Sequence, residues 1–377
     1  MAPHRFKNVV YFTEWSSVAL SQVDWSSITH IAYAFGKPHA DGSISFADPY
    51  AAFDRVDATL RLGGHFGHAH ELKTRFRGTK VGLALGGWTW SDHFSAIARS
   101  ARKRERFVAA AVQWVVDLGL DFIDLDWEYP VEGGDAGTPH HPGDAANLVL
   151  LVREFRAQLG QLAFKTELSV AAPGSPMCYR HWDLAVLSSL VDRVHVMAYD
   201  FAGGWSPRVA HHANLYPPRK KTADTLSIER LVLEYIRMGC CPEKIVLGIP
   251  LYGRVFQGAA GGLDSTFTAT TDAPYNTLPR PGAIERLDAV AGAAYSIDPT
   301  THEVVSYDSP VSLAAKLAFV KKHKLGGTMF WSVDSDAAVS TGRSLVAQAH
   351  AFYGHDNMDF GDNHAGDCAR YTLNEQA

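Results

Sequence analysis

The chain has few cysteines, no N-glycosylation acceptor and no long hydrophobic run. Its four cysteines, Cys178, Cys240, Cys241 and Cys368, are scattered over 377 residues, which excludes a disulfide framework and a zinc site built on paired cysteines. No Asn-x-Ser/Thr triplet occurs. No apolar run approaches the roughly 18 residues of a membrane-spanning helix, so we expect no membrane partner.

An excess of one charge is also missing. Lys and Arg number 35 and Asp and Glu 40, a net charge of −5, so we expect no nucleic-acid partner. The first apolar run, residues 9–12, is too short for the core of a signal peptide. We therefore expect a cytoplasmic or non-classically secreted protein, or an extracellular one if the sequence has been trimmed, and we expect a monomer.

Apolar residues are plentiful, at 46% of the chain, and they occur in a repeating order. Short apolar runs alternate with helix-like segments such as 103–118 and 145–159. Runs of this kind are typical of parallel strands buried on both faces. The eight runs are 9–13, 28–35, 80–85, 122–127, 167–172, 193–198, 244–250 and 327–332. This alternation predicts an α/β fold of the (β/α)8 TIM-barrel class.

One interval interrupts the alternation. Between Arg254 and Val311 the sequence is rich in Gly, Thr and Pro and contains two strand-like runs, 293–297 and 303–307. We interpret it as a small α+β insertion after the seventh strand. After Tyr353 the chain is polar and without strand-like runs, which makes it a candidate for disorder. The expected domains are a barrel of residues 1–254 and 308–352, an insertion of residues 255–307 and a polar C-terminal tail of residues 353–377.

Three carboxylates alternate along the fourth predicted strand. Asp124, Asp126 and Glu128 are separated by single apolar residues. Alternate residues of a strand share a face, so these three point the same way, about 6–7 Å apart at a rise of ~3.3 Å per residue. If the apolar set faces the helices, the carboxylates face the barrel interior. There they would repel one another and keep at least one proton, so Glu128, nearest the strand's C-terminal end, is a candidate proton donor.

Other interpretations of these carboxylates remain open. They could face water on an edge strand, although their apolar neighbours disfavour it. They could bind Mg²⁺ or Ca²⁺, but no histidine is near and the ligand spacing of a metal-binding loop is missing. We therefore expect no metal and no cofactor. Two histidine pairs, His140-His141 and His211-His212, also lack ligand spacing and are expected on the surface or in loops.

Further motifs accompany the stretch 121–130, Asp-Phe-Ile-Asp-Leu-Asp-Trp-Glu-Tyr-Pro. They are Leu-Gly-Gly-Trp at 85–88, Met-Ala-Tyr-Asp at 197–200, Pro-Leu-Tyr-Gly-Arg at 250–254 and Gly-Thr-Met-Phe-Trp at 327–331. In kind and order they resemble DxxDxDxE, SxGGW, MxYD and the seventh and eighth strand ends of glycoside hydrolase family 18, the chitinases and their relatives. The resemblance extends from Val9 to Asp336. The insertion lies where many members carry an α+β domain beside the cleft.

The resemblance implies retaining, substrate-assisted hydrolysis of β-1,4-linked N-acetylglucosamine polymers, chitin and chito-oligosaccharides. In that mechanism the 2-acetamido oxygen of the substrate attacks the anomeric carbon. Glu128 would protonate the leaving oxygen and then activate water. Asp126 would accept a hydrogen bond from the acetamido N–H, and Asp124 would lie behind it and share its proton. Tyr199 would donate a hydrogen bond to the acetamido oxygen.

The resemblance also implies a set of substrate-binding residues. Trp331 would form the floor under the reacting sugar, because the C–H faces of sugars pack on aromatic planes. Asp200 would contact the distorted sugar, and Trp90 is a further candidate platform. The expected binding residues are Trp331, Asp200, Met197, Tyr252, Arg254, Trp88, Tyr129, Tyr11, Phe35 and Trp205.

Two positions depart from the family pattern. Ala84 stands where the family has a serine that, with Tyr11, is thought to support the inner aspartate, so we expect Asp124 to be less well satisfied. Phe122 stands where the family has glycine, and we expect its ring to fill the barrel floor opposite the small Ala84. A modest activity or a shifted pH optimum would follow.

Two alternatives to a chitinase share this resemblance. A chitin-binding lectin of the same fold would be catalytically weak or inert, whereas the presence of Glu128 favours an enzyme. An endo-β-N-acetylglucosaminidase would apply the same chemistry to N-glycans, whereas the insertion and Trp331 favour a deep chitin cleft.

Overall fold

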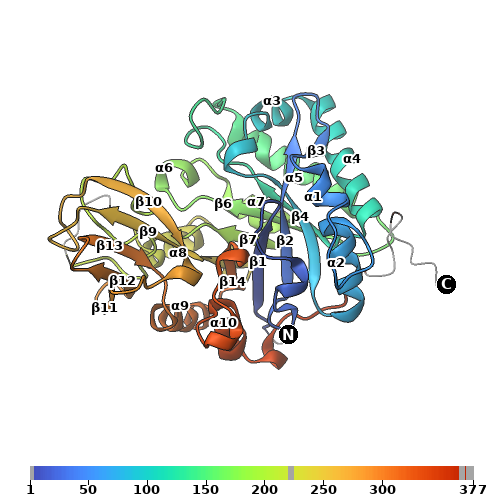
Figure 1. The fold of residues 1–377 in the computed structure, drawn as a ribbon. Helices are drawn as coiled ribbons and strands as arrows, with labels where there is room; N and C mark the ends of the chain where they lie inside the picture. The colour runs from blue at the N-terminus through green and yellow to red at the C-terminus, as the bar shows by residue number, and fades with distance from the viewer. Residues whose placement is uncertain (1–3, 220–224, 365–369, 371–377) are drawn as a thin grey trace.

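A closed barrel of eight parallel strands forms the larger part of the computed structural model, which describes residues 4–219, 225–364 and 370. The strands follow the order β1-β14-β8-β7-β6-β5-β4-β2, and pairing of β1 with β2 closes the barrel (Figure 1). The predicted (β/α)8 class is confirmed, and the predicted strand ends differ from the observed ones by at most three residues. The strands are β1 (Lys7–Thr13), β2 (His30–Pro38), β4 (Lys80–Gly86), β5 (Phe122–Asp126), β6 (Glu167–Ala172), β7 (Arg193–Val196), β8 (Ile245–Pro250) and β14 (Gly327–Trp331).

Helices cover the outside of the barrel, which is why its strands are apolar on both faces. Every residue of β5, β6, β7 and β8 is buried. Helix α4 starts at the Ser100 cap, ends at Gly119 and buries Phe107, Ala111 and Val115 along one face. A short strand, β3 (Ile44–Phe46), extends the sheet antiparallel to β2. The α-helices are α1 (Pro49–Phe53), α2 (Gly64–Arg75), α3 (Phe94–Arg99), α4 (Ala101–Leu118), α5 (Asp144–Leu159), α6 (Pro176–Tyr179), α7 (Leu184–Leu190), α8 (Ile228–Arg237), α9 (Pro310–Lys322) and α10 (Leu345–Tyr353).

The barrel floor is filled by Phe122, as predicted, but the space for its ring comes from a different residue. Strand register pairs Gly82 with Phe122 and Ala84 with Asp124. A Cβ atom on Gly82 would lie 2.4 Å from the Phe122 ring, closer than any side chain tolerates. The expectation that Ala84 compensates for Phe122 was therefore wrong, because the residue directly opposite in the neighbouring strand is Gly82.

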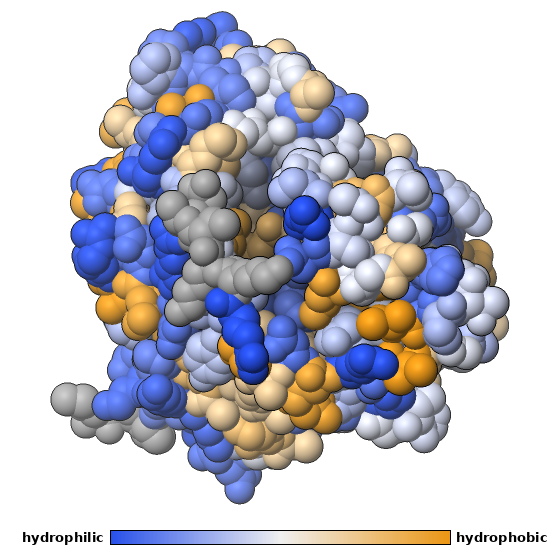
Figure 2. All heavy atoms as spheres, turned by 90° about the vertical axis from the view of Figure 1, so that its left-hand side faces the viewer, coloured by the Kyte–Doolittle hydropathy of each residue, from blue (hydrophilic) through white to orange (hydrophobic). Residues whose placement is uncertain are grey.

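The insertion follows the seventh barrel strand and forms a separate five-stranded antiparallel sheet of order β10-β9-β13-β12-β11. Between Tyr252 and Tyr307, all of which is described, it contains one short 3-10 helix, η5 (Tyr275–Thr277), rather than the α-helical part of the expected α+β unit. On the side of the molecule where this sheet lies, hydrophobic residues are interspersed among hydrophilic ones (Figure 2). Its strands are β9 (Tyr252–Gln257), β10 (Ala269–Pro274), β11 (Ile284–Asp288), β12 (Ala293–Asp298) and β13 (Glu303–Tyr307).

Residues 354–364 pack against the N-terminal end of the barrel, so the expectation of disorder was wrong for this part of the tail. Met358 forms a β-bridge with Phe6, and Asp359 lies 3.6 Å from Lys7. The Asn363 side-chain amide donates to backbone carbonyls of three residues around the end of α2 and the start of β4, at 2.8–3.2 Å. Cys368 lies outside the described residues. Across the described part of the chain, no helix has both the length and the apolar character that crossing a membrane requires.

Candidate active site

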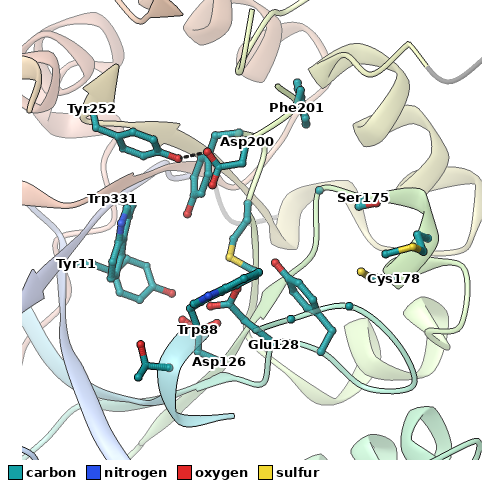
Figure 3. Close-up of a pocket in the computed structure, with 18 of the residues that line it drawn as sticks. Tyr11, Trp88, Asp126, Glu128, Ser175, Cys178, Asp200, Phe201, Tyr252 and Trp331 are labelled. Atoms are coloured by element: carbon teal, nitrogen blue, oxygen red, sulfur yellow. Dashed lines mark hydrogen bonds between the residues drawn. The ribbon is translucent and has the colours of Figure 1, made fainter. Parts of the chain in front are cut away.

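A cavity of about 560 Å³ opens where several barrel strands end, on β1, β2, β5, β7 and β14. Asp126 and Glu128 lie between Trp331 and Tyr11 on one side and Ser175 and Cys178 on the other (Figure 3). Catalytic and binding sites of such barrels form at this end of the strands. Of the sequence-predicted site residues, those lining the cavity are Tyr11, Phe35, Trp88, Trp90, Asp126, Glu128, Tyr129, Met197, Tyr199, Asp200, Trp205, Tyr252 and Trp331.

Aromatic rings form one wall of the cavity. Trp331 stacks on Phe35 with ring centroids 5.6 Å apart and meets the edge of Tyr11 at 5.4 Å. These contacts fix the indole plane in the cavity. Trp88 and Trp205 are more open, with exposed fractions of 50% and 67%. A cavity with a fixed inner ring and open outer rings can hold an extended ligand with apolar faces, such as a sugar chain.

Asp124, the innermost of the three carboxylates, is fully buried and well hydrogen-bonded. Tyr11 donates to Oδ2 at 2.5 Å and Ser169 donates to Oδ1 at 2.6 Å, while His195 Nδ1 lies 3.3 Å from Oδ1. Burial raises the pKa of Asp124, but His195, Ser169 and Tyr11 together bring it below its ordinary value. The expectation that Ala84 leaves Asp124 poorly satisfied was therefore wrong, because β6 and β7 supply the missing donors.

The pKa values of Asp126 and Glu128 are shifted in the opposite direction, upward. Burial, followed by the charges of Glu128 and Asp124, raises the pKa of Asp126 well above its ordinary value. Burial also raises the pKa of Glu128 to about 7, with a further contribution from the charge of Asp200, while a hydrogen bond from Tyr129 opposes the rise. Glu128 can therefore hold a proton near neutral pH and release it to a bound group. The solvated-edge interpretation is excluded, because β5 is an inner strand paired with β4 and β6.

The glycine pair at the end of β4 positions the Glu128 backbone. Ser91 Oγ accepts from the Glu128 N–H at 2.8 Å and donates to the Gly87 carbonyl at 2.9 Å. Gly87 has φ 80°, and a Cβ there would lie 2.6 Å from the Phe35 ring. Only glycine permits both this backbone conformation and this close ring contact.

Asp200 forms a second carboxylate site at the cavity rim. It accepts from Tyr252 Oη at 2.7 Å and from Arg254, whose other guanidinium nitrogen lies 2.7 Å from Asp272. Burial opposes ionisation, but His212, Arg254 and Tyr252 lower the pKa of Asp200 to about 2. Arg254 lines an adjoining cavity of about 340 Å³ that shares Asp200, Tyr252 and Trp331 with the main one.

Comparison with known proteins shows to which family this chain belongs. Residues 7–336 match the family described as "Glycosyl hydrolases family 18". The chain belongs to glycosyl hydrolase family 18. "Chitinase 1" of Aphanocladium album is 36% identical over 369 residues, 92% of this chain and 85% of that protein. "Endochitinase 1" of Metarhizium robertsii is 35% identical, covering 88% of this chain and 82% of that protein. The catalytic domain of psychrophilic chitinase B from Arthrobacter TAD20 superposes with a TM-score of 0.84 at 26% identity, covering 92% and 95% of the two chains.

The sequence did not lead us to the side chains that contact Asp124, the innermost carboxylate of this family 18 chain. Ser169 and His195 were not identified, although polar residues alternate with apolar ones where they stand: Glu167 and Ser169 in β6, and Arg193 and His195 in β7. Trp15, which lines the cavity and is 58% exposed, was missed because it lies just beyond the end of β1. His211 and His212 were expected on the surface or in loops; they lie in a loop, but both side chains are buried between the cavity rim and the insertion sheet.

The site contains carboxylates but offers no arrangement suited to a metal. Within residues 4–219, 225–364 and 370, no group of three or more His, Cys, Asp or Glu side chains is placed to hold a metal ion. Asp124 and Asp200 already accept hydrogen bonds from side-chain donors, as described above, and the pKa of Asp126 is raised well above its ordinary value.

Proposed function

We propose that this chain is a retaining chitinase that hydrolyses β-1,4-linked N-acetylglucosamine in chitin and chito-oligosaccharides. The carboxylate row carries the proposal. Its inner member Asp124 has a lowered pKa, Asp126 has a pKa raised well above its ordinary value, and the pKa of about 7 of Glu128 suits a general acid. Family membership and the chitinases among its relatives support the substrate.

The state of the other carboxylates favours attack by the substrate's own acetamido oxygen. Because the pKa of Asp126 is raised well above its ordinary value, this carboxyl group is a poor nucleophile, and the charge of Asp200 is shared with Tyr252 and Arg254. No free carboxylate among the described cavity residues is thus poised to form a covalent glycosyl intermediate. The acetamido oxygen can supply the nucleophile instead, in the manner of the substrate-assisted exceptions to the two-carboxylate mechanism.

Each cavity residue then has a defined task. Glu128 protonates the leaving oxygen and afterwards takes a proton from the attacking water. Asp126 accepts from the acetamido N–H through its outward oxygen, while its own proton is shared inward with Asp124. Tyr199, which lines the cavity, donates to the acetamido oxygen. Trp331 packs beneath the sugar ring, and Asp200 binds a hydroxyl group.

Cleavage of chito-oligosaccharides by the wild type and by Glu128→Gln tests this proposal. The wild type is expected to cut with retention at the anomeric carbon, seen by NMR of fresh product, and the variant to lose at least 100-fold in kcat. Fully deacetylated oligomers of the same length are the matched substrate control, and they should not be cut because they lack the acetamido oxygen.

Three results would contradict the proposal. Equal inertness of the two proteins with retained chitin binding would indicate a lectin. An inverted product would exclude the substrate-assisted route. Release of glycans from an N-glycoprotein without cleavage of chito-oligosaccharides would indicate an endo-β-N-acetylglucosaminidase.

A further inference from the structure

A buried histidine lies directly behind the carboxylate row and has no part in the mechanism above. His195 on β7 is fully buried and does not line the cavity. Its Nδ1 atom lies 3.1 Å from Tyr11 Oη and 3.3 Å from Asp124 Oδ1. Its Nε2 atom faces away from the cavity, 3.4 Å from the Nε of Arg193.

The arginine determines which ring nitrogen carries the hydrogen. Arg193 Nε–H can only donate, so His195 Nε2 must accept, and the ring hydrogen is then on Nδ1. That hydrogen points at the Asp124 carboxylate and at Tyr11 Oη, whose own hydrogen is given to Asp124. His195 therefore offers a donor to Asp124 and cannot offer an acceptor.

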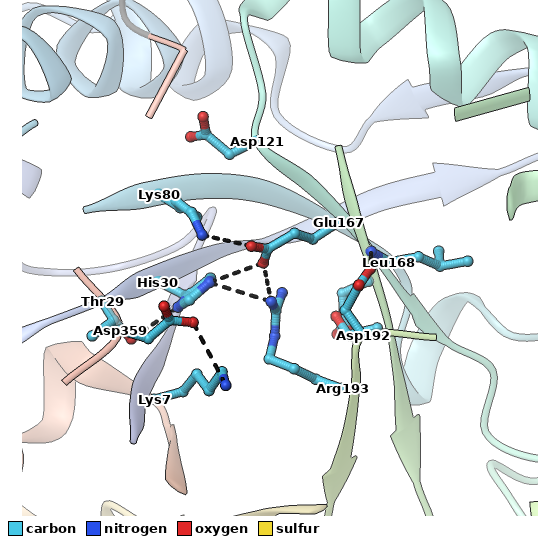
Figure 4. A network of polar contacts seen from close by, with 12 residues as sticks. Lys7, Thr29, His30, Lys80, Asp121, Glu167, Leu168, Asp192, Arg193 and Asp359 are labelled. Atoms are coloured by element: carbon cyan, nitrogen blue, oxygen red, sulfur yellow. Dashed lines mark hydrogen bonds and ion pairs between the residues drawn. The ribbon is translucent and has the colours of Figure 1, made fainter. Parts of the chain in front are cut away.

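Arg193 is itself held in place at the N-terminal end of the barrel. It pairs with Glu167, and its guanidinium lies 5.0 Å above the Phe122 ring centroid. Glu167 also binds Lys80 at 2.5 Å and His30 at 3.0 Å, so four charged or titratable groups meet below the site (Figure 4). With Glu167 fixed by three partners, Arg193 has little freedom to turn away from His195.

We propose that His195 is a positioning residue that, together with Ser169, keeps Asp124 an anion and so holds the shared proton on Asp126. The inference rests on the hydrolysis proposed above and deepens it. Ser169 and His195 both approach Oδ1 of Asp124, from β6 and β7. They take the place of the hydroxyl that is missing at Ala84, on the opposite neighbour β4.

The groups that face His195 are all consistent with Nδ1 as the donor to Asp124. Tyr11 on β1 and Asp124 on β5 face Nδ1, Arg193 on its own strand faces Nε2, and Glu167 on β6 and His30 on β2 lie beyond Arg193. The charge of an anionic Asp124 raises the pKa of Asp126 and so favours a proton on it, and Asp126 Oδ1, which has no hydrogen-bond partner among the described residues, is free to accept from the acetamido group. Without the His195 donor, Asp124 would gain a proton at higher pH, and this arrangement would be lost earlier on acidification.

A pair of nearly isosteric variants tests the inference. His195→Asn keeps an N–H close to the position of Nδ1, whereas His195→Leu has similar size and no donor. We expect the acidic limb of the kcat profile of His195→Leu to move up by about 1 pH unit, since a hydrogen bond to a charged group contributes about that much. Its kcat should fall several-fold with KM unchanged, because His195 does not line the cavity. His195→Asn should restore most of the profile.

Folding and the proposed function are checked separately. Thermal unfolding verifies each variant, and His195→Val is a second donor-free variant should His195→Leu not fold. Titration of the Asp124 carboxyl by 13C NMR needs no activity, and its midpoint should rise in the donor-free variants. An unmoved midpoint and acidic limb, or equal shifts in the Asn and Leu variants, would overturn the inference. A wild type that is inert toward chito-oligosaccharides but shows the NMR shift would contradict the proposed function alone.

Discussion

Replacing Glu128 with glutamine is expected to stabilise the protein at pH 8 while abolishing its activity. The pKa of Glu128 rises from 4.5 to about 7 in the folded chain, mainly because the side chain is buried. Since the folded state holds this proton more tightly than the unfolded state, the free energy of unfolding falls as pH rises from 4.5 to about 7. At ~1.4 kcal/mol per pKa unit, the loss amounts to about 3 kcal/mol.

Glutamine is neutral at every pH and nearly identical in shape, so the variant avoids this loss. The two proteins should unfold alike at pH 4, and Glu128→Gln should be more stable by about 3 kcal/mol at pH 8. For 377 residues at ~2.1 cal/mol/K each, that difference corresponds to a Tm increase of about 4 °C. Thermal unfolding of both proteins between pH 4 and 8 measures it.

The matched control is Glu105→Gln, which changes an exposed glutamate of α4. This variant also removes one carboxylate, but an exposed one, so it separates the effect of burial at Glu128 from the loss of a negative charge. If Glu128→Gln had the same effect on Tm at pH 4 and pH 8, Glu128 would not be protonated through burial. The role of Glu128 as an acid near neutral pH would then lose its physical basis.

Three further changes test the floor, the tail and the charge at the rim. Gly82→Ala, whose Cβ would lie 2.4 Å from the Phe122 ring, should destabilise the chain by about 1–3 kcal/mol, and combining it with Phe122→Ala should recover part of the lost Tm. Asn363→Ala removes a donor to three backbone carbonyls and should cost about 2 kcal/mol by thermal unfolding, and an unchanged Tm would show that the tail is not needed. Asp200→Asn removes a negative charge that raises the Glu128 pKa, so the alkaline limb of kcat/KM should move to lower pH, and an upward shift would contradict that assignment.

The sequence was sufficient to predict the barrel and most of the residues named here that line the candidate cavity. All eight apolar runs became barrel strands, because a strand buried on both faces must be apolar throughout. The common direction of Asp126 and Glu128 followed from the two-residue repeat of a strand. Errors arose where a residue's surroundings come from distant parts of the chain, as with His212, which the insertion sheet and the cavity rim bury.

The insertion and the tail were also predicted incompletely, because their surroundings come from distant parts of the chain. Two of the five strands of the insertion were predicted. Of the others, β10 and β11 are largely exposed and lack a buried pattern, whereas β9 has buried residues and was missed although it follows the seventh barrel strand closely. The tail was judged by its polar composition, yet Asn363 is buried because it satisfies carbonyls at the end of another helix. Composition cannot reveal a partner that lies 280 or more residues away in the chain.

Local order in the sequence thus determined the strands, the shared face of the three carboxylates and the aromatic residues at strand ends, because strand periodicity depends on near neighbours alone. Only the tertiary structure decided the protonation pattern. Asp124 takes its donors from Tyr11, Ser169 and His195, on three other strands. Closure of the barrel brings these side chains to one level of its interior. Because the carboxyl groups are buried there, each hydrogen bond has a large effect on their pKa values and so on which of them holds the proton.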